Sequence, residues 1–260
     1  MKTNNKRIKK LNNISALIIA KNAEDNIKKC LKTLKKTNIE NIILIDDFST
    51  DKTPKIAENL GSIIFRRHLN NNFAAQKNFG LTKTHSDWVF ILDSDESLSP
   101  HLISFLSNFA PKKYSEYSAI SFKRQDFFLN KKLKHGENAY LFFPRLVNRK
   151  NGKFVRKVHE TWQSNFPVLP QKNLFFTHHP HPNLKSFFQK INYYSTLRAQ
   201  ELKEKGESSH LFQIIFYPPA KFLQNYLFRL GFLDGMPGLI MALGMSLHSF
   251  LTHAKSFTQK

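Results

Sequence analysis

The sequence predicts an α/β fold, in which a mostly parallel, Rossmann-like sheet is flanked by helices. Short apolar runs alternate with helical patterns along the first part of the chain. Such alternation is typical of strand–helix–strand units, whose strands pair in one sheet through right-handed crossovers. Polar residues also follow three of the apolar runs directly. Parallel sheets bind ligands at the carboxyl ends of their strands, so we expect the functional site at that edge.

The first elements follow one another in a regular order. Strands are expected at residues 14–20, 42–45, 62–65 and 88–92, with helices between them at 23–36, 53–60 and 73–82. The first helix is indicated by Ile27, Leu31 and Leu34, whose spacing places them on one helix face. The second helix is expected to begin at Asp51 or Thr53, because both side chains suit the N-cap position.

The rest of the chain changes character twice. Short strands are expected at 118–123, 127–128, 140–147 and 174–176, with turns between them. From Asn183 the pattern is helical and basic, and we expect breaks at Pro218-Pro219, Gly231, Gly235 and Pro237-Gly238. We therefore divide the chain into a basic tail (1–13), an α/β half (14–112), a β-rich half (113–182) and a basic, amphipathic helical extension (183–260).

The composition limits the partners without choosing among them. The 260 residues carry a formal net charge of +21, which indicates nucleic acid, an anionic membrane surface or phosphorylated substrates. The single cysteine, Cys30, excludes an intramolecular disulfide and cannot form a thiolate zinc site alone. No apolar run reaches the roughly 18 residues of a membrane-spanning helix. We therefore expect a cytoplasmic protein, with contact to a membrane left open.

The most informative segment is 88–96, where an apolar run ends in Asp93-Ser94-Asp95-Glu96. Two ionised carboxylates so close together repel each other and resist burial. A divalent cation removes the conflict, because Mg²⁺ or Mn²⁺ takes one or two carboxylates together with substrate phosphates. The segment therefore predicts a site for a nucleotide diphosphate. The alternative interpretation is a polar loop and helix N-cap, and Glu96 is expected to cap or solvate that loop.

Polar clusters follow two other expected strands as well. Lys21-Asn22 comes directly after the first strand, and Asp46-Asp47 comes after the second. A carboxylate at a strand end can accept a hydrogen bond from a nucleobase or a ribose hydroxyl. The alternative is a turn built on Asp and Ser side chains. Together with Asp93-Ser94-Asp95, the clusters predict one ligand site at one edge of the sheet.

These motifs occur in the order in which glycosyltransferase family 2 has them. The matching segments are 17–24, 45–51, 75–81, 88–96, 158–160, 194–197 and 231–235. On these segments the chain resembles the inverting enzymes of that family, which have the GT-A fold. It is most similar to the bacterial branch that adds a sugar to the lipopolysaccharide inner core, described as β-1,4-glucosyltransferases. One departure is Phe48, which stands where that branch has a glycine.

The resemblance implies a nucleotide diphosphate sugar donor, with UDP and glucose favoured, and a lipid-linked glycan acceptor. It also implies a divalent cation, Mg²⁺ or Mn²⁺. The half 14–112 would bind the donor, and the half 113–182 would receive the acceptor and supply the catalytic base. An anionic membrane surface is the expected further partner, reached from the inner face of the bacterial cytoplasmic membrane. No nucleic acid is expected.

On the donor side, the resemblance implies roles for single residues. Asp95 is the expected metal ligand and catalytic residue, and Asp93 is an expected second metal ligand and a contact to the nucleotide sugar. Lys77 would pair with the donor phosphates and Asn78 would hydrogen-bond the sugar, whereas a solvated helix face is the ordinary alternative. The remaining expected contacts to the nucleotide sugar are Ala20, Asn22, Glu24, Asp46, Asp47, Gln76 and Ser94.

Glu160, within Val158-His159-Glu160, is the expected general base, because an inverting transfer needs one carboxylate to take the proton of the acceptor hydroxyl. The alternative for Glu160 is a surface ion pair with Arg156 or Lys157. His178 is an expected further metal ligand by resemblance. Its alternative role is a hydrogen bond between the sheet and the following helix.

Three interpretations compete with a lipopolysaccharide glycosyltransferase. A transferase that builds a polyprenyl-phosphate sugar, or acts on another cell-envelope glycan, would share the donor half. A nucleic-acid-binding protein is suggested by the charge, but the sequence has no helix-turn-helix, zinc or RNA-binding aromatic motif. A non-catalytic relative is opposed by the presence of Asp93, Asp95 and Glu160. Residues 214–257 suit either a helix hairpin in an anionic membrane surface or a helical layer on the main domain.

Overall fold

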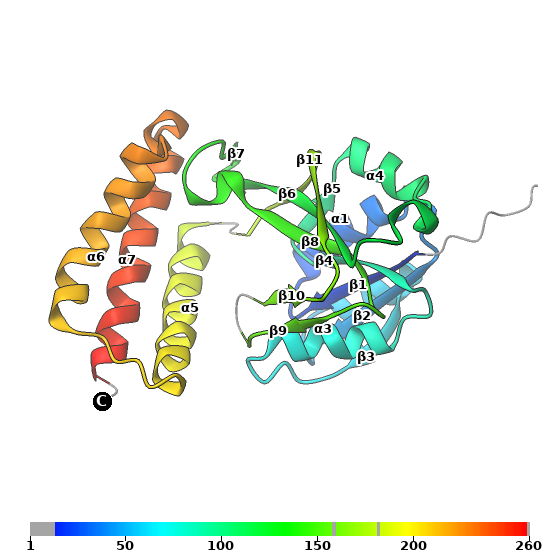
Figure 1. Ribbon diagram of the computed structural model, residues 1–260, viewed down its shortest axis with the longest axis horizontal. Helices are drawn as coiled ribbons and strands as arrows, with labels where there is room; N and C mark the ends of the chain where they lie inside the picture. The colour runs from blue at the N-terminus through cyan, green and yellow to red at the C-terminus, as the bar shows by residue number, and fades with distance from the viewer. Residues whose placement is uncertain (1–13, 158–159, 181–182, 259–260) are drawn as a thin grey trace, which may run out of the picture.

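The computed structural model describes residues 14–157, 160–180 and 183–258. A mixed sheet with the strand order β3-β2-β1-β4-β8-β6-β11-β5 forms its centre, and β7 adds to β6 (Figure 1). Helices flank the sheet, and three long helices follow it at the carboxyl end of the chain. The predicted α/β fold is therefore confirmed.

The first four strands are parallel and lie next to one another. They are β1 (Ile14–Ala20), β2 (Asn41–Asp46), β3 (Ile63–Arg66) and β4 (Trp88–Asp93). The centre of β1 pairs with both neighbours, with Ile18 opposite Leu44 of β2 and Leu92 of β4. All three side chains are completely buried, as expected for a parallel sheet covered on both faces.

The helices between these strands lie close to the predicted ranges. They are α1 (Glu24–Leu34), α2 (Thr53–Asn59) and α3 (Phe73–Thr82), and α4 (Pro100–Ser107) follows later. One core cluster joins α1 and α4 to the sheet through Leu31 and Leu102, and a second joins α3 to the other face through Leu81. Gly80 lets α3 approach β1, because a Cβ there would lie 2.4 Å from Leu17.

The second half of the sheet brings distant segments to the end of β4. It consists of β5 (Glu96–Leu98), β6 (Ala119–Phe128), β7 (Lys131–Lys132), β8 (Phe142–Asn148) and β11 (Val168–His178), and β9 (Lys153–Val155) pairs separately with β10 (Thr161–Gln163). Strand β11 runs parallel to β6 and antiparallel to β5. His178 is thereby placed opposite Glu96, directly beside the acidic end of β4.

Three helices form the C-terminal extension: α5 (Leu184–Glu204), α6 (Leu211–Leu223) and α7 (Met236–Thr258). Short turns at Gln224–Phe228 and Gly231–Asp234 connect α6 to α7. Helix α5 lies between the sheet and the α6–α7 pair (Figure 1). Within the described ranges, no helix is both long and apolar enough to cross a bilayer.

Several expectations about element boundaries are wrong. The strands expected at 118–123 and 127–128 are one strand, β6, and the strand expected at 174–176 is the end of β11. Pro218 and Pro219 do not break the chain but lie inside α6. The fixed φ of proline is compatible with a helix, but proline has no backbone N–H to donate to the carbonyl four residues earlier. The carbonyls concerned are those of Ile214 and Ile215, and Ile215 is an exposed residue. The break comes earlier, at Gly206, whose φ of 71° ends α5. The strand expected from residue 140 begins instead at Phe142, after a short 3₁₀ turn.

Candidate active site at the carboxyl ends of β1, β2 and β4

The loops after β1 and β2 are tied to each other by short side chains. Asn22, which has a φ of 46°, accepts a hydrogen bond from the backbone of Thr50 (2.8 Å). Glu24 accepts one from the backbone of Lys52 (3.0 Å), and the carbonyl of Ala20 accepts one from the backbone of Asp47 (2.9 Å). The three expected donor contacts on β1 and its loop therefore shape the rim of the site. Contact with the nucleotide stays a prediction for each of them.

Asp46 and Asp47 are both buried at the end of β2. Asp46 accepts a hydrogen bond from the backbone of Ser49 (3.2 Å), which is the turn that the alternative interpretation describes. The carboxylate of Asp47 accepts hydrogen bonds from the side chain of Lys21 (2.9 Å) and from the backbone N–H of Leu69 (3.0 Å). These carboxylates hold the loop together, and a direct contact with the nucleoside stays a prediction.

Phe48 follows these carboxylates with a φ of 50°, a conformation that costs a non-glycine residue about 1–2 kcal/mol. Its ring stacks on His68 with a centroid distance of 3.9 Å and an angle of 17°. The stack offsets part of that cost and leaves Phe48 43% exposed. The loop therefore offers a flat aromatic surface where the resembled branch of the family has a glycine.

Three consecutive residues of α3 serve different purposes. Gln76 is completely buried and exchanges two hydrogen bonds with Arg67 (2.5 and 2.8 Å). Asn78 donates to the carbonyl of Phe154 (2.8 Å) and accepts from its backbone N–H (2.9 Å). These arrangements favour structural roles for the two amides, and their contact with the donor stays a prediction. Lys77, between them, is the residue of the three that faces the acidic centre.

We expect Asn78→Ala to lower the free energy of unfolding by about 1–3 kcal/mol, because it leaves a backbone donor and acceptor of Phe154 without partners. Urea unfolding measures this change. The matched control is Asn38→Ala, which removes one exposed hydrogen bond to the Ser107 carbonyl and is expected to cost no more than about 0.5 kcal/mol. Donor affinity should stay within about twofold for Asn78→Ala, and a tenfold loss with unchanged stability would assign Asn78 to the sugar instead.

Lys77 connects the acidic end of β4 to the expected base. Its side chain is buried, forms an ion pair with Glu160 and lies 4.0 Å from a carboxylate oxygen of Asp93. The neighbours Arg156 and Lys157 pair with Glu201 and Glu204 on α5. Glu160 therefore forms neither of the surface ion pairs weighed as its alternative role. His159 lies outside the described residues.

Arg145 on β8 is a site residue that sequence reasoning missed. Its buried guanidinium donates to Asp93 (2.8 Å) and to Glu96. Although burial opposes ionisation of Asp93, Arg145 and Lys77 hold the pKa of that carboxyl well below its ordinary range. Burial raises the pKa of Glu96 to about 7, against the opposing effect of Arg145.

The expectation that Glu96 solvates the loop is wrong. Its side chain is buried, accepts the backbone N–H of Asp93 (2.9 Å) and pairs with Arg145. A buried carboxylate needs a nearby cation, and β8 supplies one from a position remote in the sequence. Ser94 occupies the half-buried turn between β4 and β5.

Arg145→Met is expected to lower the free energy of unfolding by about 3–5 kcal/mol, because it removes the buried cation that pairs with both Asp93 and Glu96. Urea unfolding at neutral pH measures the loss. Lys150→Met, which removes an exposed ion pair with Asp87, should change stability by no more than about 1 kcal/mol. Adding Glu96→Gln to Arg145→Met should recover part of the loss. A loss below about 1 kcal/mol in Arg145→Met would contradict this account.

Asp95 and His178 form the second half of the acidic centre. Nδ1 of His178 is hydrogen-bonded to Asp126 (2.8 Å), and its Nε2 lies 3.6 Å from Asp95. Lys190 of α5 lies 3.7 Å from the same Asp95 oxygen. Although burial opposes its charge, Asp95 and Asp126 raise the pKa of His178 to about 9. Neither Asp126 nor Lys190 was expected from the sequence.

These residues fit a divalent cation that takes few protein ligands. Within the described part of the chain, no group of three or more His, Cys, Asp and Glu side chains is arranged to enclose a metal. The 3.6 Å between Asp95 and His178 is less than twice the metal–ligand distance of about 2.1 Å, so both can bind one ion once the proton on Nε2 of His178 is displaced. Asp126 holds His178 by its other ring nitrogen, as in many metal sites. Asp93 is instead paired with Arg145, and its role as a ligand stays a prediction.

Helix α5 covers one side of this centre. Tyr193 donates a hydrogen bond from its hydroxyl to Asn71 (2.9 Å), which joins α5 to the loop before α3. Burial, together with the charges of Asp93 and Asp95, raises the pKa of Tyr194 to about 12. The first half of α5 therefore belongs to the site as well as to the C-terminal extension.

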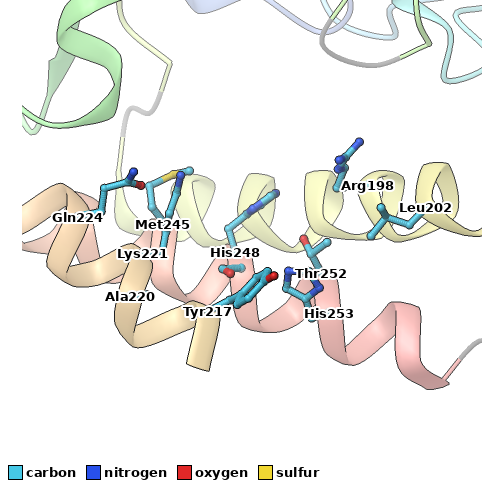
Figure 2. Close-up of a pocket in the computed structure, with 11 residues that line it drawn as sticks. Arg198, Leu202, Tyr217, Ala220, Lys221, Gln224, Met245, His248, Thr252 and His253 are labelled. Carbon is cyan, nitrogen blue, oxygen red and sulfur yellow. The ribbon is translucent and has the colours of Figure 1, made fainter. Parts of the chain in front are cut away.

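A separate groove of about 540 Å³ lies in the C-terminal extension. It runs between α5 and α6, with residues of α7 along it, and Figure 2 shows Lys221, His248 and Thr252 among its lining side chains. None of the residues expected at the donor or acceptor site lines it. The groove is therefore a feature of the helix bundle, distinct from the acidic centre.

The sequence matches one family model and several curated proteins. The model of the family described as glycosyl transferase family 2 matches residues 15–191. The lipopolysaccharide core biosynthesis glycosyltransferase LpsC of Rhizobium meliloti is 28% identical over 262 residues, which cover 94% of this chain and 92% of LpsC. An uncharacterized glycosyltransferase of Rickettsia typhi is 27% identical over 262 residues, covering 93% of this chain and 86% of that protein.

Solved structures share the fold at low sequence identity. The mannosyltransferase PcManGT of Pyrobaculum calidifontis, crystallised with GDP-Man and Mn²⁺, gives a TM-score of 0.56 at 11% identity, covering 95% of this chain and 88% of PcManGT. Residues 1–349 of TarS from S. aureus, in complex with UDP-GlcNAc, give a TM-score of 0.51 at 14% identity, covering 95% of this chain and 91% of that one.

Proposed function

The chain belongs to glycosyltransferase family 2, and from this premise we propose that it is a metal-dependent inverting hexosyltransferase. It moves a hexose, glucose favoured, from a nucleotide diphosphate sugar, UDP favoured, to a lipid-linked glycan such as the lipopolysaccharide inner core. One observation carries the proposal. Lys77 contacts both Glu160, the expected base, and Asp93 of the acidic centre. The group that would activate the acceptor and the groups that would bind the donor diphosphate therefore lie close together.

In this mechanism Glu160 takes the proton of the acceptor hydroxyl as its oxygen attacks the anomeric carbon of the donor sugar. The bond from that carbon to the diphosphate oxygen breaks, and the nucleoside diphosphate leaves with both electrons. Asp95 and His178 would hold the cation, which stabilises the leaving diphosphate when bound. Lys77 adds a fixed positive charge on the same side.

The nucleoside is proposed to lie over the loop after β2. Asp46 and Asp47 are buried there, and the exposed ring of Phe48 offers a flat apolar surface beside them. A nucleobase has the shape and polarity for such a surface. On this proposal the half 14–112 binds the donor and the half 113–182 receives the acceptor, with Glu160 at its edge.

The acceptor is proposed from the relatives and from the charge of the chain. The similar LpsC is described as a lipopolysaccharide core biosynthesis enzyme, and its alignment spans most of both chains. The net charge of +21 suits a phosphorylated, lipid-linked glycan and an anionic membrane. We place the protein on the inner face of the bacterial cytoplasmic membrane. A polyprenyl-phosphate acceptor would use the same donor half and remains the second candidate.

Nucleotide release by the purified protein tests the proposal. A panel of nucleotide sugars is offered with Mg²⁺, Mn²⁺ or a chelator, with and without extracted lipid-linked glycan. We expect release from one donor that depends on metal and increases with the glycan. Release that needs polyprenyl phosphate instead would select the second candidate. Absence of release under all conditions would indicate a non-catalytic relative.

A further inference from the structure

The outer face of the α6–α7 pair carries a concentration of exposed apolar side chains. We propose that this face docks onto an anionic lipid bilayer, with the two helices lying in the membrane surface. The inference deepens the proposed function, on which it rests for the lipid-linked acceptor, by naming the surface that makes contact. We call this surface the hairpin face and define it by α6, the turn at 224–235 and one side of α7.

On α6 the exposed residues follow a helical period. Phe212, Ile215, Phe216 and Leu223 are between 43% and 62% exposed and share one side of the helix. Large apolar side chains at this spacing usually point into a core. Here they point away from the rest of the chain, so the apolar side of an amphipathic helix is left uncovered.

The turn between α6 and α7 is the most exposed part of the hairpin face. Phe228 is 81% exposed and Met236 is 65% exposed. The turn is held in place from below, because the buried carboxylate of Asp234 accepts hydrogen bonds from the backbone of Lys134 (3.0 Å) and His135 (2.9 Å). The apolar tip is therefore anchored to the loop that follows β7.

On α7 the exposed stripe and the groove lie on different sides. Leu243, Leu247 and Phe250 are exposed and spaced by four and three residues. At about 100° per residue they lie roughly opposite His248 and Thr252, which line the groove shown in Figure 2. The stripe is therefore separate from the groove, and we assign it to the hairpin face.

The charges around the hairpin face suit anionic lipid. From Ser208 to the end of the sequence, Asp234 is the only carboxylate, and it is buried. Lys221 of the same segment lines the groove and pairs with Glu137, but Arg229 in the turn adds a positive charge, and β7 and the loop after it add Lys132 and Lys134, both exposed. A helix pair facing water would carry both signs of charge on its surface. The helix pair itself has no exposed carboxylate, and Glu137 of the main domain is paired with Lys221. Apolar side chains beside cations, with little acid near them, are typical of helices that lie in an anionic membrane surface.

The docked helices would also fix the orientation of the active site. Helix α7 packs on α5 so closely that a Cβ at Gly244 would lie 2.3 Å from the ring of Phe187. Helix α5 in turn reaches the acidic centre through Lys190, 3.7 Å from Asp95. Helix α5 therefore connects the membrane-bound hairpin face to the acidic centre, so docking would hold the active site in a fixed orientation relative to the bilayer.

Vesicle co-sedimentation of the full chain tests the proposal. We expect binding to phosphatidylcholine vesicles that contain phosphatidylglycerol and at least tenfold weaker binding to phosphatidylcholine alone. Phe228→Ser/Met236→Ser should weaken binding at least tenfold, and so should Phe212→Ser/Phe216→Ser at the other end of the face. The matched control is Ile63→Ser/Phe166→Ser, which removes two apolar side chains, 52% and 48% exposed, from the catalytic domain and should bind like the unchanged protein.

Two outcomes would overturn the proposal. One is vesicle binding that the two hairpin variants leave unchanged. The other is a chain that binds no vesicle but is a dimer in solution, with both hairpin variants monomeric, which would make the face an interface between copies. Hydrolysis of the nucleotide sugar in the absence of lipid is measured as well, so that failure of the membrane proposal can be distinguished from failure of the proposed function. The hairpin variants should retain that hydrolysis, and its absence from every protein would refute the enzyme while leaving the vesicle result standing.

Discussion

Replacing Asp95 with alanine is expected to lower metal-dependent turnover by about 10²–10³-fold or more, because the cation loses its carboxylate ligand. His178, the other ligand in this assignment, lies 3.6 Å away and cannot hold the ion alone. The fold should survive. Asp95 lies in a turn and its side chain is 20% exposed. Without it, His178 keeps its hydrogen bond to Asp126, and Lys190, whose side chain is 41% exposed, can be solvated.

The measurement is nucleotide release over a titration of Mn²⁺, beside thermal unfolding of the same protein. The matched control is Asp87→Ala, which removes an exposed carboxylate just before β4 and should leave both quantities unchanged. Turnover of Asp95→Ala close to that of the unchanged protein would remove the metal assignment. In that case Lys77 and Arg145 would be the cations left to stabilise the leaving group.

Glu160→Gln is expected to reduce the rate of sugar transfer by about 10²–10⁴-fold while donor affinity stays near normal. Glutamine keeps the shape of the side chain but cannot take the proton of the acceptor hydroxyl. The donor should still bind, since Lys77 and the acidic centre remain. Transfer to the glycan and donor affinity are measured separately, the latter by titration calorimetry with the nucleotide sugar.

Glu204→Gln is the control for this substitution, because it removes an exposed carboxylate that also pairs with a lysine, Lys157. It should leave transfer unchanged. If Glu160→Gln transfers sugar at the normal rate, the base lies elsewhere, and the neighbouring histidines become the next candidates. If donor affinity falls instead of the rate, Glu160 acts only by holding Lys77 in place.

The elements of the first part of the chain could be predicted from the sequence because their signals are local. Strand β1 was expected at 14–20 and has those bounds, and α3 was expected at 73–82 and has those bounds. Each depends on a periodic pattern within one short segment. The break predicted at Pro218-Pro219 is wrong because it also depended on a local signal alone. Pro218 and Pro219 are local break signals, and the packing of α6 on α7 outweighs them.

The site could be predicted only in part, because its geometry depends on pairings across the sheet. Arg145 reaches Asp93 only because β8 pairs with β4, and no local pattern specifies that pairing. A signal was present nonetheless, since an arginine inside a buried strand requires a carboxylate partner. In α3 the sequence placed Gln76, Lys77 and Asn78 together at the donor. A helix turns 100° per residue, and only the structure shows that Lys77 faces the acidic centre.

The pairing of β11 with β5 has a consequence for how the protein is made. Asp95 emerges early in synthesis, whereas His178 and the helix that carries Lys190 emerge only after two thirds of the chain. A nascent or truncated polypeptide that ends before β11 therefore contains the loops after β1, β2 and β4 but not the completed acidic centre. On the proposed metal assignment, premature termination in that interval should yield fragments that do not bind the cation. Assembly of the reaction centre is thus a late event in biosynthesis.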